Sequence, residues 1–384
     1  MTGTVKHGGE AHHFSLPDFI KKNTVLTVAF CAALITSFIV PPDSAYLSYF
    51  DFKTLTCLFC TLAVICALND IDFFTIVARR IVLLTGNIRR AVISIVVITF
   101  VGSMLIANDM ALLTFLPLGY FVLTSSGKEK YMIFTFVMQN IGANLGGMLT
   151  PFGNPQNLYL YNKFSIPSGE FMNIMLVPFL CAITLILVCC LVFVKSEPIT
   201  VSAGTGAKND KLPALRTALY LLLFAFSIVI VFRVIPYYYG LIVIPAVLLA
   251  ADPRALSKVD YCLLLTFVCF FVFSGNMARI DAVNGFISAM LEKNTLVVSV
   301  LSCQFISNVP SAILLSSFTD NYRALLYGVN MGGCGTLIAS LASLITFRKY
   351  SSAYPNGVGR YILIFSAFNF AFLIIITVVC SFLC

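Results

Sequence analysis

The sequence predicts an all-α polytopic membrane protein: an inverted-topology repeat with two re-entrant helical hairpins, broken helices and about nine full spans. Of its 384 residues, 59% are hydrophobic and only 10% are charged, whereas soluble domains carry roughly 25% charged residues. Polar and helix-breaking residues interrupt apolar sequence in two places, residues 103–157 and 307–343. A bilayer core tolerates irregular backbone only inside protein or beside a water-filled cavity.

Composition also limits the function classes. The net charge of +8 is typical of basic loops on the cytoplasmic side of a membrane protein, so we expect no nucleic-acid partner. Most of the 13 cysteines lie in apolar runs, and the C-x-x-C pair Cys57 and Cys60 has no histidine nearby, which favours packing over redox or metal chemistry. His7, His12 and His13 all lie in the N-terminal tail. No histidine is therefore left for catalysis or metal binding at membrane depth, and we expect no covalent cofactor.

The elements of the first half follow from apolar runs, turn residues and charges. We predict a cytoplasmic tail over 1–22 and a first repeat over 23–195, followed by a flexible polar linker over 196–213. The repeat is expected to contain spans over 23–40 and 53–68, an interfacial amphipathic helix over 70–85, a hairpin over 91–123, a broken helix over 131–157 and a span over 171–194.

The second half, 214–384, presents the same elements in the same order. It is expected to contain spans over 214–234, 239–250 and 259–273, an interfacial helix over 275–292, a hairpin over 295–320, a broken helix over 322–347 and a last span over 361–384. The span over 239–250 has no counterpart in the first half.

The tips of the two hairpins are similar in sequence. One reads I-A-N-D-M-A-L-L (Ile106–Leu113) and the other I-S-N-V-P-S-A-I-L-L (Ile306–Leu315), so Asn108 corresponds to Asn308. The helices that follow contain N-I-G-A-N-L-G-G from Asn140 and N-M-G-G-C-G-T from Asn330. This shared order of unusual elements predicts an internal repeat.

Lysine and arginine predict the orientation. If each hairpin returns to the side from which it entered, most of the 24 basic residues fall on one face, which the positive-inside rule assigns to the cytoplasm. We therefore expect a multi-pass protein of the plasma (inner) membrane, in contact with membrane lipid, with a cytoplasmic N-terminus and an extracytoplasmic C-terminus. The first hairpin then opens from the inside and the second from the outside.

Hairpin tips and helix breaks can form a solute site at the bilayer midplane, where helix N-termini attract anions and freed carbonyls hold cations. Neutral side chains and close-approach glycines predict which residues take part; the alternative for the small residues is helix packing. Candidates for substrate binding are Asn108, Asn144, Thr150, Gly153, Asn154, Ser307, Asn308, Pro310, Gly335 and Thr336. Candidates for ion coupling are Asn108, Asp109, Asn140, Gly142, Asn308 and Asn330, with a possible Na⁺ site at Asn108, Asp109 and Asn144.

Asp109 is the one carboxylate that this arrangement places deep in the membrane. Ionisable residues there are costly and point to function, so Asp109 is interpreted as a sodium ligand or a proton carrier. The alternative is a cap for the second hairpin arm, a role compatible with ion binding.

These tips, the N-P-Q-N run and the segment Gly328–Ile345 resemble the ion transporter superfamily, in particular the divalent-anion/sodium symporters and the arsenite-permease and sodium/proton-antiporter-like branch. The resemblance implies an elevator-type motion, often a homodimer, and Ser-Asn-Thr-like tips that form cation sites. Ala107 and Val309 lack the hydroxyls of that pattern, which puts the sodium sites in doubt. Asp109 resembles the permease and antiporter branch and favours proton coupling.

The sequence therefore predicts a secondary active transporter that moves a small inorganic or carboxylate anion with Na⁺ or H⁺. The alternative is a sodium/proton antiporter on the same fold without an organic substrate. A membrane enzyme is disfavoured because no H-E-x-x-H, G-x-S-x-G or phosphate-binding loop is present. A passive channel would not require paired hairpins. No lysine or arginine lies at either tip to identify the anion.

Overall fold

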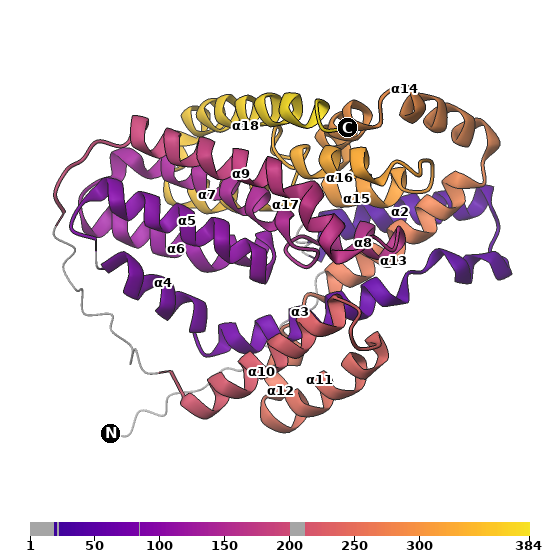
Figure 1. Ribbon diagram of the computed structural model, residues 1–384, viewed down its shortest axis with the longest axis horizontal. Helices are drawn as coiled ribbons and strands as arrows, with labels where there is room; N and C mark the ends of the chain where they lie inside the picture. The colour runs from indigo at the N-terminus through magenta and orange to yellow at the C-terminus, as the bar shows by residue number, and fades with distance from the viewer. Residues whose placement is uncertain (1–18, 21–22, 84, 200–211) are drawn as a thin grey trace, which may run out of the picture.

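The computed structural model (Figure 1) describes residues 19–20, 23–83, 85–199 and 212–384. Within these ranges the protein is helical and forms no strand, only one isolated bridge between Asn87 and Pro198. The predicted N-terminal tail and most of the predicted linker lie outside the described residues.

The first half contains two long antiparallel arms, α5 and α6, followed by an interrupted helix, α7 and α8. Its elements are α2 (Thr24–Ile39), η1 (Ser44–Tyr49), α3 (Phe52–Asp70), α4 (Phe73–Leu83), α5 (Ile88–Ile106), α6 (Asn108–Ser125), η2 (Glu129–Tyr131), α7 (Met132–Gly146), η3 (Gly147–Leu149), α8 (Pro155–Lys163) and α9 (Ser168–Phe193).

The second half contains a shorter hairpin, formed by the end of α14 with α15, and a second interrupted helix, α16 and α17. Its elements are α10 (Ala214–Val231), α11 (Tyr237–Ala251), α12 (Pro253–Ser257), α13 (Tyr261–Ala278), α14 (Asp281–Ile306), α15 (Asn308–Leu315), α16 (Tyr322–Met331), α17 (Leu341–Ala353), η4 (Pro355–Gly357) and α18 (Val358–Ser381).

Among the described residues, seven stretches of helix are long and apolar enough to cross a membrane: α3, α5, α9, α10, α13, α14 and η4 with α18. The helices α2 and α11 are apolar but shorter. The halves of the two broken helices are too short individually to meet this length. An all-helical protein with this many apolar helices is a polytopic membrane protein, as the sequence predicts.

Two buried cores enclose the first hairpin. The larger core joins α7, α8 and α9 to helices α14–α18 and receives Val96 and Leu112 from one side of the hairpin. The other core joins α3 and α4 to α10 and α11 and receives Ile95 and Phe115 from the opposite side. In Figure 1, α5 and α6 accordingly lie between α4 on one side and α7, α9 and α17 on the other.

Three element boundaries differ from the sequence-based expectation. The helix α4 begins only after Asp72, whose φ of 55° breaks the chain direction. The predicted interfacial helix starts later than expected, because α13 continues to Ala278 and α14 begins only at Asp281, whereas its expected separation from the next hairpin arm is present as a non-helical kink at Asn294 (φ −163°, ψ 90°). The helix α17 continues past Arg348 to Ala353, because exposed basic side chains do not interrupt helical geometry.

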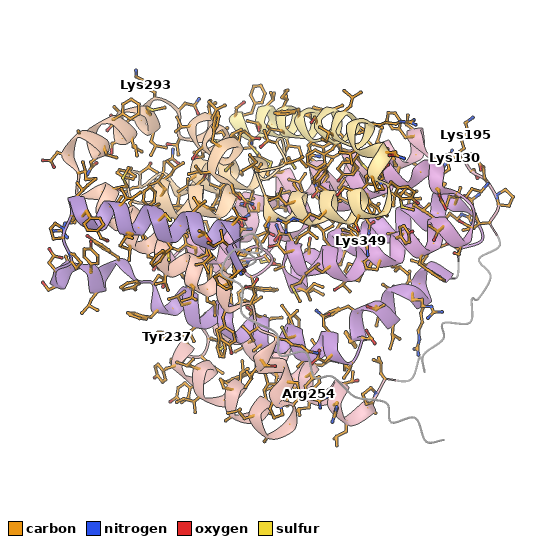
Figure 2. All side chains as sticks on the ribbon, turned by 180° about the vertical axis from the view of Figure 1, so that it is seen from behind. Lys130, Lys195, Tyr237, Arg254, Lys293 and Lys349 are labelled. Atoms are coloured by element: carbon orange, nitrogen blue, oxygen red, sulfur yellow. The ribbon has the colours of Figure 1, made fainter. Side chains whose placement is uncertain are left out.

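The beginning of the predicted linker is bound rather than free. The Nζ atoms of Lys128 and Lys130 lie 2.6 and 2.7 Å from the carboxylate of Glu197, and these bonds lower the pKa of Glu197 to about 2. The carbonyl of Glu197 also accepts from the Ile88 amide at 2.9 Å. Figure 2 shows Lys130 and Lys195 together at one end of the molecule and Lys293 at the opposite end.

Candidate functional site

The two hairpin tips have matching backbone geometry. Ala107, between α5 and α6, has φ 61° and ψ 152°, and Ser307, between α14 and α15, has φ 73° and ψ 159°. Such angles are essentially restricted to glycine and cost of order 1–3 kcal/mol elsewhere, so they persist only where the surroundings enforce them. Both tips therefore store strain at positions that the sequence alignment had already paired.

The asparagine that follows each strained residue begins the next helix. Asn108 Oδ1 accepts from the Asp109 amide at 3.0 Å, and Asn308 Oδ1 accepts from the Val309 amide at 2.9 Å. Each oxygen thus satisfies one of the amides that a helix start leaves unpaired. The N-cap position of the second hairpin arm is Ala107, which has no side chain that could cap it, so the Asp109 amide is satisfied by Asn108 instead.

A chain of buried amides joins the first tip to both helix breaks. Asn108 Nδ2 donates to Asn144 Oδ1 at 3.1 Å, and Asn144 Nδ2 donates to the Gly333 carbonyl at 3.3 Å. A Cβ on Gly333 would lie 3.1 Å from Asn308 Nδ2, so the second tip touches the same segment. Residues from both halves of the chain therefore meet in one polar centre, which we call the tip centre: Asn108, Asn144, Asn308 and Gly333.

The second tip is also bonded to the segment that follows the second break. The Asn308 amide donates to the Ala339 carbonyl at 3.0 Å, and Ser307 Oγ donates to the same carbonyl at 3.2 Å. Pro310 lies buried in the first turn of α15, next to the tip.

The first break gathers oxygen atoms. A Cβ on Gly147 would lie 2.4 Å from Asn154 Oδ1 and 2.7 Å from the Gly153 carbonyl oxygen. A Cβ on Gly153 would lie 2.3 Å from the Gly147 carbonyl oxygen and 2.8 Å from Thr150 Oγ1. Both glycines are thus required by close approach, and each of them faces two oxygens of the break.

One of these side-chain oxygens receives no hydrogen bond from the described residues. Asn154 Oδ1 is buried without a hydrogen-bond partner among the described residues, while its Nδ2 donates to the Asn144 carbonyl at 3.2 Å. Neutral amide, hydroxyl and carbonyl oxygens suit a hard cation and not a soft transition metal. The residues present therefore fit an alkali cation such as Na⁺.

Asp109 lies beside the tip centre, and its carboxylate is partly buried. The residue is half-buried, and its Oδ1 is buried without a hydrogen-bond partner within the described part of the chain. Asp260, which precedes α13, interacts with it electrostatically. In the second tip Val309 occupies the equivalent position. A buried carboxylate oxygen with no donor is available to a proton or a cation.

Asn140 and Asn330, two of the predicted ion-coupling residues, lie about one helical turn before the tip centre in the chain. Their side chains bond the two halves of the protein to each other. Asn140 Nδ2 lies 3.4 Å from Ser343 Oγ, and Asn330 Nδ2 donates to Asn157 Oδ1 at 2.7 Å. The first half of each broken helix thus bonds the second half of the other. Gly142, by contrast, packs against α5, since a Cβ there would lie 3.5 Å from the Val96 carbonyl oxygen.

Sequence reasoning missed two glutamines that organise the site. Gln139 Nε2 donates to Thr99 Oγ1 and to the Phe115 carbonyl, both at 3.0 Å, and so ties both arms of the first hairpin to α7. Gln304, in the apolar arm before the second tip, bonds the segment that contains Gly335 and Thr336. A long carboxamide within a largely apolar helix, close to the polar residues of a tip or a break, is the signal that could have identified each of them.

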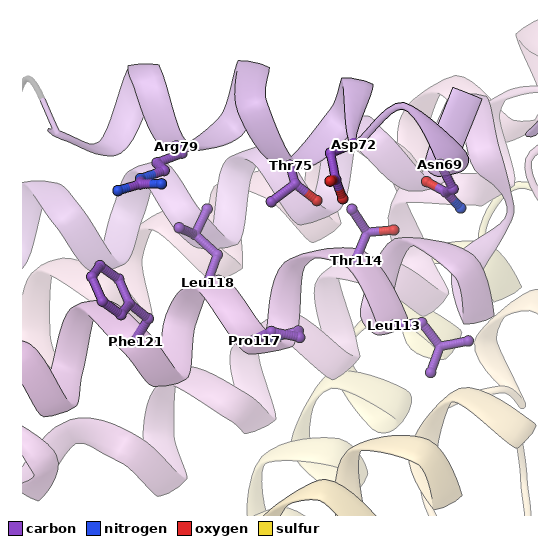
Figure 3. Close-up of a pocket in the computed structure, with 9 residues that line it drawn as sticks. All are labelled: Asn69, Asp72, Thr75, Arg79, Leu113, Thr114, Pro117, Leu118 and Phe121. Atoms are coloured by element: carbon purple, nitrogen blue, oxygen red, sulfur yellow. The ribbon is translucent and has the colours of Figure 1, made fainter. Parts of the chain in front are cut away.

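A cavity of about 540 Å³ separates the first hairpin from α4. Figure 3 shows Asp72, Thr75 and Thr114 facing one another across it. The full lining is Asn69, Asp72, Thr75, Arg79, Leu113, Thr114, Pro117, Leu118 and Phe121. The outer arm of the hairpin, α6, therefore faces open space along a face that begins one turn beyond Asp109.

Comparison with known proteins identifies similar chains. A family model described as CitMHS, citrate transporter, matches residues 19–322, a range that contains both hairpin tips. The uncharacterized transporter MJ0456 of Methanocaldococcus jannaschii is 33% identical over 322 residues, which cover 82% of this chain and 85% of that protein. The inner membrane protein YbiR of Escherichia coli K12 is 28% identical over 283 residues, which cover 72% of this chain and 74% of that protein.

Proposed function

This chain belongs to the CitMHS citrate transporter family, and from that premise we propose that it moves a small inorganic or carboxylate anion across the membrane with Na⁺ or H⁺. The family and the relatives support the function of a membrane transporter. One observation supports the tip centre as the transport site: two strained tips of matching geometry meet two helix breaks there.

The proposed anion site uses backbone rather than basic side chains. The helices α6 and α15 begin at the tips, and α8 and α17 begin just after the two breaks. The positive dipole ends of these helices favour an anion. A cation held by the oxygens of Gly147, Gly153 and Asn154 would add positive charge beside it. Binding of the cation would then raise the affinity for the anion, which is the coupling that symport requires.

We propose that the two halves form an inverted-topology repeat. Three pairs of matching features support this. They are the backbone angles of the two tips, the hydrogen bonds between the first half of each broken helix and the second half of the other, and a third pair at the hairpin arms. In that third pair, Thr150 Oγ1 donates to the Met104 carbonyl at 2.8 Å, and Thr336 Oγ1 donates to the Gln304 carbonyl at 3.1 Å.

The transport cycle that we propose is an elevator-type motion. The hairpins, broken helices, α9 and α18 would move against a scaffold of α2, α3, α10, α11 and α13, which would also carry the contact of a homodimer. The cavity between α4 and α6 (Figure 3) supports an approach to the first tip from the cytoplasm. The proposed orientation puts the N-terminus in the cytoplasm and the C-terminus outside the plasma membrane.

A second function, sodium/proton antiport, is favoured by Asp109. Its unpartnered Oδ1 could exchange a proton for a sodium ion without any organic substrate.

Uptake into proteoliposomes separates the two functions. The labelled candidates are citrate, a dicarboxylate, sulfate and arsenite. We expect citrate or one of the other three to accumulate when an inward Na⁺ or H⁺ gradient is imposed, and not without the gradient. An empty-vesicle control and a gradient collapsed by ionophore measure the passive leak. Proton movement on addition of sodium alone, with no uptake of any of these anions, would overturn the symport proposal in favour of antiport.

Single cysteines test the opposite orientation of the hairpins. In a chain freed of its 13 native cysteines, we expect Asn108→Cys to react with a membrane-impermeant maleimide from the cytoplasmic side in one state. Asn308→Cys is expected to react from the outside in the other state, because the two tips enter from opposite faces. Residues 293 and 130 lie at opposite ends of the molecule (Figure 2), so Lys293→Cys and Lys130→Cys are the controls for sidedness. Reaction of both tips from one face in every state would contradict the inverted repeat.

A further inference from the structure

The second helix break leaves backbone groups without helical partners. The helix α16 ends at Met331 and α17 begins only at Leu341. The carbonyls that end a helix and the amides that follow have no partner of their own. At membrane depth no bulk water replaces it. The segment between the two helices therefore holds its shape only if other groups in the protein satisfy these atoms.

Gln304 satisfies three of these groups. Its Nε2 donates to the Gly332 carbonyl at 3.0 Å and to the Cys334 carbonyl at 3.1 Å. Its Oε1 accepts from the Thr336 amide at 2.9 Å. The same Nε2 also lies 3.2 Å from the Val300 carbonyl of its own helix. A single carboxamide thus bonds three backbone groups of one unwound stretch, residues 332–336, which we call the second break segment.

The fit between the side chain and the backbone is tight. Gly335 has φ +114°, which side-chain-bearing residues rarely adopt, and a Cβ there would lie 2.2 Å from Gln304 Oε1. The second break segment therefore packs closely around the Gln304 side chain. This close contact explains why residue 335 is a glycine.

The first break is braced in another way. There Asn154 Nδ2 and Asn157 Nδ2 reach back to the carbonyls of Asn144 and of Gly147 and Met148. In the second broken helix the matching positions hold Ser340 and Ser343, whose side chains are shorter and bond each other at 3.0 Å. The first break is held by its own helix, whereas the second is held by the hairpin arm.

The residue that matches Gln304 in the first hairpin is Met104. It contributes only its backbone carbonyl, which accepts from Thr150 Oγ1 at 2.8 Å. The side-chain brace is therefore particular to the second half, and it joins the second hairpin and the second break segment into one body.

The second break segment carries groups of the tip centre. The Gly333 carbonyl accepts from Asn144 Nδ2 at 3.3 Å, and its Cα hydrogens face Asn308 Nδ2, since a Cβ there would lie 3.1 Å away. We propose that Gln304 is a positioning residue of the transport site, which fixes the second break segment and through it Asn144 and Asn308. The proposal rests on the proposed function for its transport consequence but not for its structural one.

A native thiol reports on the structural consequence. Cys334 lies on the second break segment and is 1% exposed, so with the other cysteines among the 13 replaced by serine or alanine, it should react slowly with a maleimide. Gln304→Met keeps the approximate volume of the side chain and removes all three bonds to the second break segment, together with the bond to the Val300 carbonyl. We expect the labelling rate of Cys334 to rise at least about tenfold, the change that corresponds to about 1.4 kcal/mol in an opening equilibrium.

The transport consequence is measured in the same variant with labelled citrate in proteoliposomes. We expect the KM for citrate to rise about tenfold and the maximal rate to change by less than about threefold, because anchoring of the tip centre affects binding before translocation. A general loss of folding would instead lower the maximal rate with the amount of folded protein.

Two further variants make the test specific. Met104→Leu is the matched control, since the residue has no side-chain bond to lose, and it should change neither labelling nor KM. Gln304→Glu retains the acceptor for the Thr336 amide but sets a carboxylate oxygen against two carbonyls, so Cys334 should label as fast as in Gln304→Met. Unchanged labelling in a folded Gln304→Met protein would overturn the proposal. If wild-type protein takes up no citrate, the substrate assignment fails while the labelling result still judges Gln304.

Discussion

Replacing Asp109 with asparagine is expected to abolish the coupling between the ion gradient and transport while leaving the protein folded. The carboxylate has a buried oxygen without a donor within the described residues, and an amide of the same shape can neither release a proton nor offer a charge to Na⁺. Coupling free energies of about 1–3 kcal/mol correspond to about 5- to 150-fold changes in affinity. We therefore expect the stimulation of uptake by Na⁺ or H⁺ to fall by a factor in that range.

The measurement is initial uptake in proteoliposomes as a function of the Na⁺ and H⁺ gradients. Asp260→Asn makes the same chemical change at the neighbouring carboxylate. Asparagine is as good a cap as aspartate, so the bond from the Leu263 amide, 2.9 Å long in the present protein, should persist. This control should retain ion-driven uptake. Full coupling in Asp109→Asn would instead assign Asp109 a purely structural role.

Replacing Gly146 with alanine is expected to destabilise the protein strongly. A Cβ at this position would lie 2.1 Å from the carbonyl oxygen of Phe100 and 2.5 Å from Ser103 Oγ. One of these contacts is backbone, so α7 must move away from α5. Overpacking of this kind costs roughly 1–3 kcal/mol and occasionally more. Because α7 and α5 lead directly to the tip centre, uptake should fall together with stability.

The midpoint of thermal unfolding in detergent measures the effect, followed by far-UV circular dichroism because the chain contains no tryptophan. Gly142→Ala, one turn earlier on the same helix, is the matched control. Its Cβ would meet the Val96 carbonyl oxygen at 3.5 Å, an ordinary contact, and alanine in a helix interior is about 1 kcal/mol more favourable than glycine. We expect this variant to be as stable as the parent or more stable. Equal midpoints for both variants would show that α5 and α7 tolerate separation.

Much of the site could be predicted because short stretches of the sequence mark its residues. Asn108 and Asn308 stand out as polar residues within apolar arms, and Pro151, Gly153 and Pro155 mark a helix that cannot continue. The asymmetry between Asp109 and Val309 is visible as soon as the tips are aligned. The boundaries of elements were less predictable, because the start of α14 and the length of α17 depend on packing.

The partners of these residues could not be predicted. Nothing local indicates that Asn330 bonds Asn157, or that Gln304 shapes the segment around Gly335, because the paired residues are joined only by the packing of separate helices. Gln139 likewise reads as one polar residue in an apolar span until α5 and α6 are seen on either side of it.

The sequence by itself determined that this is a polytopic helical membrane protein, where its helices break, and which neutral side chains and which carboxylate lie at the breaks. These properties follow from hydropathy, glycine and proline, which act over a few residues. Only the tertiary structure decided that both tips meet both breaks, and that the two breaks are braced differently, one by its own asparagines and one by a glutamine of the hairpin. The physical reason is that each backbone group freed in an apolar interior needs a partner, and packing alone selects which side chain supplies it.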